Sequence, residues 1–188
     1  WFGWFGFNSG SALGANADAV NAFANTNLAS AAAMITWMFY ERFQDRKMSA
    51  VGACIGAIFG LVAITPAAGF VNIGQSIFIG AIAALASNLA IRLFNRSEID
   101  DTLDVFPSHG VGGIVGMILN AVFANEVGLV HGQTETFLYH LLALVIVSAF
   151  TFIGSYALYY VVDLVLKVRV TEKQEEKGLD LSQHGEQV

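Results

Sequence analysis

Long runs without a charged side chain divide this sequence into segments. Positions 19–40, 48–91, 105–125 and 136–162 contain no Asp, Glu, Lys or Arg. A helix needs about 20 mostly apolar residues to cross the hydrocarbon layer of a membrane. The pattern therefore predicts several membrane-spanning helices, and an all-helical soluble core is a much weaker interpretation.

The run 48–91 is too long for one crossing and fits two. It is interrupted at 65–69 by Thr-Pro-Ala-Ala-Gly, a turn signal. The predicted spans lie near 18–41, 48–64, 73–94, 103–124 and 136–166, preceded by the end of a further span over 1–15. We therefore expect an all-α polytopic membrane protein, with a transmembrane domain over 1–166 and a polar tail over 167–188.

The positive charges orient these spans. All nine Lys and Arg residues fall in three clusters, which are Arg42, Arg46 and Lys47, then Arg92 and Arg96, then Lys167, Arg169, Lys173 and Lys177. Neighbouring clusters are separated by two predicted crossings, and the connections 65–72 and 125–135 contain no Lys or Arg. By the positive-inside rule, all three clusters and the C-terminal tail are predicted to be cytoplasmic.

Composition narrows the class of protein further. Hydrophobic residues make up 55% of the chain and charged residues 13%, against about a quarter charged in soluble domains. No metal-ligand spacing, phosphate-binding loop, nucleotide fingerprint or nucleophile motif occurs. We expect no enzyme activity, no cofactor, no metal and no nucleic-acid partner. The start of the chain resembles the middle of a membrane helix, so we expect a fragment of a longer protein.

His109 is the most informative single residue. It lies in Phe106-Pro107-Ser108-His109-Gly110, inside a predicted span. Ionisable residues are costly within a membrane and commonly mark a functional site. A neutral imidazole offers one donor and one acceptor, which suits a small hydrogen-bonding solute or a proton relay. The alternative is a structural histidine bonded to a neighbouring helix. Pro107 lacks a backbone N–H and leaves a nearby carbonyl free.

Trp4, Phe7 and Ser11 form a second candidate site. Their spacing places them on one face of a helix. Aromatic rings attract a cation, and a hydroxyl oxygen can accept a hydrogen bond from it. Taken alone, these residues favour an aromatic stripe packed against lipid or other helices over a cation site.

Acidic residues precede the span that contains His109. Asp100, Asp101 and Asp104 are interpreted as structural residues that cap a helix N-terminus and complement its dipole. Asp18 has the same expected role at the start of 18–41. His131 and His140 have no partner pattern, so we expect structural roles for both.

Three motifs resemble those of the Amt/Mep/Rh ammonium transporters. Residues 1–11, Trp-Phe-Gly-Trp-Phe-Gly-Phe-Asn-Ser-Gly-Ser, are similar to the signature of the family's sixth helix, and 100–113 to that of its tenth helix. The tail residues Arg169, Glu175, Gly178-Leu179-Asp180 and His184-Gly185-Glu186 are similar to the Amt branch. The resemblance implies the ammonium transporter fold, here its second inverted repeat plus the long final helix.

The resemblance also implies roles for individual residues. Phe7 corresponds to the inner of two gate phenylalanines, Trp4 to a pore-lining tryptophan and Ser11 to the hydroxyl of the ammonium recruitment site. His109 corresponds to the second of two pore histidines. The first histidine and the other gate and recruitment residues belong to helices 1–5 of the family, so this chain alone is not expected to transport.

The implied function is transport of ammonium or ammonia across the plasma membrane by a homotrimer embedded in lipid. The pore would recruit ammonium, remove a proton and conduct ammonia with help from its histidines. The alternative is an ammonium sensor that signals through its cytoplasmic tail, to which a PII-class regulator could bind. A generic channel or structural bundle is a third, weaker interpretation.

Overall fold

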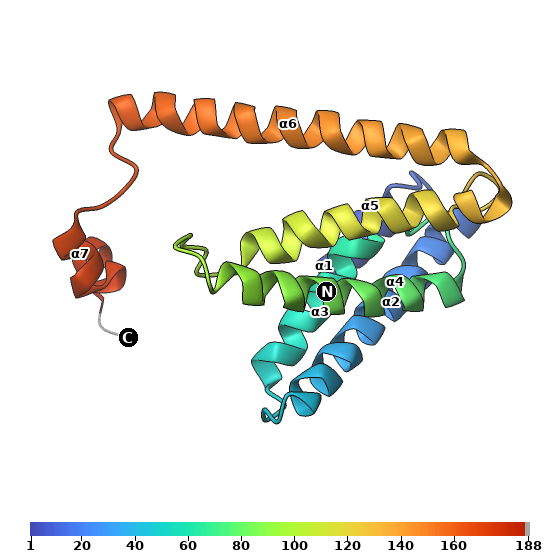
Figure 1. The fold of residues 1–188 in the computed structure, drawn as a ribbon, viewed down its shortest axis with the longest axis horizontal. Helices are drawn as coiled ribbons and strands as arrows, with labels where there is room; N and C mark the ends of the chain where they lie inside the picture. Colours follow the sequence, from blue (N-terminus) through green and yellow to red (C-terminus); the bar gives the residue numbers. More distant parts are fainter. Residues whose placement is uncertain (187–188) are drawn as a thin grey trace. The chain divides into compact units, whose positions relative to one another are not determined.

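The structure is a computed structural model that describes residues 1–186 and consists of helices joined by short connections, with no strand in that range (Figure 1). The helices are α1 (Phe2–Gly10), α2 (Ala17–Phe43), α3 (Ala50–Ile64), α4 (Ile73–Phe94), η1 (Phe106–Val111), α5 (Gly112–Phe123), η2 (Leu129–His131), α6 (Thr134–Val165), α7 (Glu172–Lys177) and η3 (Asp180–His184). Gln187 and Val188, at the end of the predicted tail, lie outside the described residues. The chain forms two compact units, divided between Leu144 and Val145.

Most predicted segments coincide with observed helices. The predicted break at 65–69 is a turn, and α4 spans the predicted residues 73–94. A capping box between Asn72 and Gln75 fixes the start of α4. The first helix is shorter than predicted. It ends at Gly10, and Leu13 has a φ of 53°, a left-handed conformation that cannot continue a right-handed helix. Asn16, rather than Asp18, caps α2 by accepting a hydrogen bond from the N–H of Ala19.

Small residues bring the helices of the first unit close together. A Cβ added at Gly80 would meet the backbone of Ala29, so α4 touches the backbone of α2 there. A Cβ at Gly60 would also meet Ala29, and one at Gly116 would meet the backbone of Ala63. Helices in lipid are held by such close packing, because water does not drive apolar groups together there. Ala29, Ala63 and Ile79 are fully buried within this core.

Polar side chains of α2 support the turn between α3 and α4. Asn25 is fully buried, and its Nδ2 donates to the carbonyl oxygens of Ala68 at 2.9 Å and Val71 at 2.7 Å. The hydroxyl of Ser30 donates to the carbonyl of Ala57 at 2.9 Å. Non-helical backbone is tolerated at membrane depth only where such partners satisfy it. Asn25 therefore stabilises the turn that the Pro-Gly signal predicts.

Among residues 1–186, three helices are long and apolar enough to cross a membrane, namely Ile73–Phe94, the continuous segment Phe106–Phe123 and Thr134–Val165. Ala50–Ile64 is apolar but shorter. α2 has 27 residues, about 40 Å at the rise of an α-helix, but its buried Asn, Thr and Ser residues reduce its hydropathy. The protein is thus an all-helical membrane protein, and the count of five complete crossings stays a prediction.

The second unit contains the end of α6 and a folded tail. The Arg169 guanidinium binds both carboxylate oxygens of Glu175, at 2.7 and 3.1 Å. These hydrogen bonds lower the pKa of Glu175 below its ordinary value. Thr171 and Gln174 form a capping box at the start of α7. The tail was expected to be only polar, and in the structure it contains short helices.

Candidate functional site

Trp4 lies on α1 and is fixed by the end of α3. Its indole Nε1 donates to the hydroxyl oxygen of Thr65 at 2.8 Å, and that hydroxyl donates to the carbonyl of Leu61 at 2.8 Å. An indole has a single N–H donor. Because Thr65 accepts it, Trp4 has only its ring to offer a solute. Thr65 is a functional candidate that the sequence prediction missed.

Phe7 lies between two cavities of different character. One, of about 220 Å³, is lined by Gly3, Trp4 and Phe7 only. The other, of about 500 Å³, is lined by Phe7 and by residues of α1, α2 and the α3–α4 turn, including Asn8, Ser11, Asp18 and Thr65. The rings of Trp4 and Phe7 meet edge to face, with centroids 5.9 Å apart. Phe7 thus lines both an apolar cavity and a more polar one.

Ser11 presents an acceptor to the larger cavity. It follows α1, and its hydroxyl donates to the carbonyl of Phe7 at 2.9 Å. With its hydrogen directed at the backbone, the Ser11 oxygen keeps lone pairs for an incoming donor. Asn8 is buried beside it and donates to the hydroxyl of Thr26 at 2.9 Å. Asp18 also lines the cavity, and a carboxylate near it attracts cations.

His109 lies in a widened helical turn. Phe106–Val111 is a π-helix, with Pro107 near its start, and it continues directly into α5. Proline removes one backbone donor, and π-turns often occur at functional sites. The ring of Phe106 stacks on Phe94 at 5.0 Å, which holds this turn against α4. The His109 side chain is exposed, and within residues 1–186 its ring forms no hydrogen bond. It does not bridge to a neighbouring helix, as a structural histidine would.

The acidic residues before this turn differ in their contacts. The carboxylate of Asp101 accepts hydrogen bonds from the N–H groups of Val105 and Phe106, both at 2.8 Å. Asp104 contributes its backbone, because its carbonyl accepts from the N–H and the hydroxyl of Ser108. Its φ is 51°. The carboxylate of Asp100 accepts from the hydroxyl of Thr102 at 3.0 Å. Of the three acidic side chains expected to cap, only that of Asp101 binds backbone N–H groups within the described residues.

His140 is satisfied locally. Its Nδ1 lies 2.8 Å from the carbonyl oxygen of Thr136, and its Nε2 lies 3.3 Å from Nδ2 of Asn120 on α5. With Nδ1 as donor, both ring nitrogens have partners. His140 therefore has the structural contacts that His109 lacks.

The two candidate sites lie on helical elements that contact α3. Trp4 contacts the end of α3 at Thr65. A Cβ added at Gly112, directly after the π-turn, would meet Val62 of the same helix at 3.2 Å. No hydrogen bond or ring contact joins His109 to Trp4, Phe7 or Ser11 within residues 1–186. The structure brings Trp4, Phe7 and Ser11 together, and α3 links this group to the turn that contains His109.

Comparison with known proteins gives a consistent result. The model of the Ammonium Transporter Family matches residues 1–188. An ammonium transporter of Aquifex aeolicus is 45% identical over 192 residues, which cover 99% of this chain and 45% of that protein. One from Bacillus subtilis is 42% identical, covering 99% of this chain and 48% of that protein. The chain thus spans about half the length of these curated relatives.

Solved structures agree with the sequence comparison. The crystal structure of Candida albicans Mep2 superposes with a TM-score of 0.87 at 36% identity, over 93% of this chain and 41% of that one. A structure described as a sensor Amt protein gives a TM-score of 0.87 at 27% identity, over 97% of this chain and 46% of that one. On the match over its whole length, the chain belongs to the ammonium transporter family.

Proposed function

We propose that the protein containing this chain transports ammonium across the membrane, and that α1 supplies part of the entrance to its pore. The observation that carries this proposal is the position of Phe7, which lines both the polar cavity and the apolar cavity. An ion is stable on the polar side, whereas an apolar passage favours an uncharged solute. Phe7 is a gate at the boundary between the two.

Recruitment of the ion fits the groups in the larger cavity. Ammonium has only N–H donors, so it needs acceptors. The Ser11 oxygen is one, because its own hydrogen is donated to Phe7. The rings of Trp4 and Phe7 add cation–π attraction, and the N–H of Trp4 is occupied by Thr65. A proton donor that would repel the ion is thereby kept out of the site.

His109 is proposed to act deeper in the pore. Carrying the ion through an apolar passage is costly, so loss of a proton allows ammonia to pass. An imidazole without an internal partner can exchange a proton with this solute or with a second histidine. The second histidine and the outer gate would come from the half of the fold beyond the part that this chain spans. We further propose a homotrimer in the plasma membrane, with the C-terminal tail in the cytoplasm.

The test is His109→Ala in the full-length protein, reconstituted in vesicles and supplied with an ammonium gradient. We expect ammonium flux to fall about a hundredfold, the lower range for a positioned proton-transfer group, while trimers still form. His131→Ala is the control, because His131 is an exposed histidine at the end of η2, outside the candidate site. Unchanged flux and ion selectivity in His109→Ala would exclude this role.

A sensor is the second candidate function, because one solved structure at 27% identity is described as a sensor Amt protein. In that case the tail, alone or with a PII-class regulator, would transmit ammonium binding. The same vesicle assay separates the two functions. A full-length wild-type protein that binds ammonium but moves none across the membrane would favour the sensor.

A further inference from the structure

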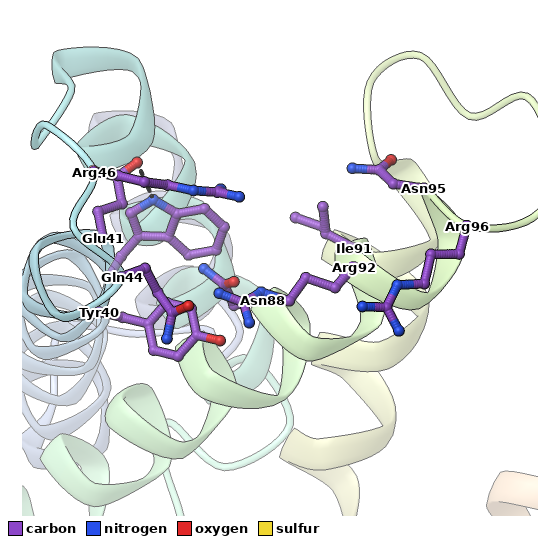
Figure 2. A pocket seen from close by; sticks show the side chains of 10 residues that line it. Tyr40, Glu41, Gln44, Arg46, Asn88, Ile91, Arg92, Asn95 and Arg96 are labelled. Carbon is purple, nitrogen blue, oxygen red and sulfur yellow. Dashed lines mark hydrogen bonds between the residues drawn. The ribbon is translucent and has the colours of Figure 1, made fainter.

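A cavity of about 360 Å³ lies where α2 and α4 end, away from the two cavities lined by Phe7 (Figure 2). Its wall is formed by residues of the last turns of both helices and of the connections after them, namely Trp37, Tyr40, Glu41, Gln44, Arg46, Asn88, Ile91, Arg92, Asn95 and Arg96. Its volume is in the range of small-ligand sites, about 300–1,000 Å³. From the sequence alone, the arginines among them indicated only the orientation of the spans.

The wall of this cavity is strongly positive. Three arginines, Arg46, Arg92 and Arg96, line it together with a single acidic residue, Glu41. The Glu41 oxygens are already bound by the indole N–H of Trp37 and by the N–H of Ser49 at the start of α3, both at 3.1 Å. Figure 2 shows Glu41 at one side of the cavity. A helix N-terminus stabilises a carboxylate, so Glu41 is held by α3 and not by the arginines.

The three guanidiniums have no anionic partner of their own. Within residues 1–186, none of them forms an ion pair or a side-chain hydrogen bond. Arg92 is partly buried and lies over the ring of Tyr40, 4.9 Å from its centroid. This contact uses the face of the guanidinium and leaves the N–H groups at its edge free. The Nε of Arg92 is buried without a partner among the described residues.

From this arrangement we infer that the cavity binds a phosphate group. Planar guanidiniums match phosphate oxygens in pairs and form stronger hydrogen bonds than neutral donors. The C-terminal ends of two helices repel an anion, and three convergent arginines outweigh that effect.

The surroundings point to an anionic phospholipid as the source of that phosphate. Phe43 is 81% exposed and Leu93 is 57% exposed, and they lie on the same helix ends as the arginines. Basic pockets between membrane helices bind lipid headgroups, and each arginine near the surface strengthens this binding. Apolar side chains beside the cavity would contact the acyl chains. The inference depends on membrane insertion and not on the proposed pore.

The experiment is native mass spectrometry of the full-length protein in detergent, titrated with dioleoylphosphatidylglycerol. Dioleoylphosphatidylcholine, which has the same chains and no net charge, is titrated in parallel. Removing two arginines with Arg92→Gln/Arg96→Gln should weaken phosphatidylglycerol binding about 25-fold, or about fivefold for each. Arg42→Gln is the control, because Arg42 lies in the last turn of α2, one of the two helices that form the cavity, but does not line it. If the double variant fails to fold, Arg46→Gln replaces it, because Arg46 is exposed. This variant should weaken phosphatidylglycerol binding about fivefold.

Inorganic phosphate, measured by calorimetry with the same variants, distinguishes the two sources. The wild type could bind inorganic phosphate, lose this binding in the double variant, and show no preference for phosphatidylglycerol. That result would support the site and identify its ligand as a soluble phosphate. The inference is overturned if neither ligand binds, or if the arginine variants change binding no more than Arg42→Gln does. Failure here would leave the His109 flux assay unaffected, because the two sites share no residue.

Discussion

At the scale of single residues, the contact that most restricts the candidate site is the one between Trp4 and Thr65. Thr65→Val keeps the shape of the side chain but removes the oxygen that accepts the indole N–H and the hydroxyl that binds Leu61. An unsatisfied donor costs about 1–3 kcal/mol. We expect thermal unfolding of the full-length protein to show this decrease in the free energy of unfolding, together with a reduced ammonium flux.

Thr65→Ser keeps the hydroxyl and is the control for this change. It should retain both the unfolding temperature and the flux of the wild type. Equal flux in Thr65→Val and Thr65→Ser would show that the orientation of Trp4 does not matter for transport.

The chemical character of the site residues could be predicted from the sequence, whereas their contacts with distant residues could not. The spacing of Trp4, Phe7 and Ser11 on one helix was sufficient to group them. The partner of Trp4 could not be found in this way, because 61 positions separate it from Thr65. Two apolar helices in contact leave no local signal of which threonine meets which indole. The arginines of the cavity at the ends of α2 and α4 were missed for a related reason, since the charge pattern gives the side of the membrane and not the direction of a side chain.

At the scale of helices, close backbone contact decides which glycines can change. Gly116→Ala would place a methyl group against the carbonyl of Ala63, whereas a Cβ at Gly113 of the same helix meets nothing within 4 Å. We expect Gly116→Ala to destabilise the protein by about 1–3 kcal/mol, because α3 and α5 must separate.

Gly113→Ala should be neutral or stabilise the helix by up to about 1 kcal/mol. Thermal unfolding in the same detergent measures both variants. Equal unfolding temperatures for the two would contradict the contact between α5 and α3.

Helix positions were well predicted where a turn signal or a capping residue marks them, as at Asn72. The widened turn of η1 was not predicted, although Pro107 had indicated a free carbonyl there. A proline signals that one hydrogen bond is missing, but the choice between a kink and a π-turn depends on packing, here the stack of Phe106 on Phe94. The short α1 likewise depends on the left-handed Leu13, which no residue pattern indicates.

At the scale of the whole chain, the tail belongs to the second unit and has its own pH dependence. The pKa of Glu175 is lowered chiefly by its hydrogen bonds to Arg169. Its ionised form therefore stabilises the tail at neutral pH, and this contribution is lost as the pH falls through the lowered value. The carboxyl ¹³C shift of Glu175 should titrate below the ordinary glutamate range of about 4.3.

Arg169→Gln is the control, and it should return the titration of Glu175 to that ordinary range. An unchanged titration curve in this variant would rule out the guanidinium as the cause.

The buried Asn25, Thr26 and Ser30 have a consequence for how the protein is made. On an isolated α2 in lipid, each of these side chains would face hydrocarbon, which makes insertion of that helix alone unfavourable. Thr26 donates to the carbonyl of Ala22 in its own helix. The partners of Asn25 and Ser30, which are the carbonyls of Ala57, Ala68 and Val71, are synthesised later in the chain. The biosynthetic machinery would thus have to hold α2 until α3 and the following turn emerge, and release the three segments into the bilayer together.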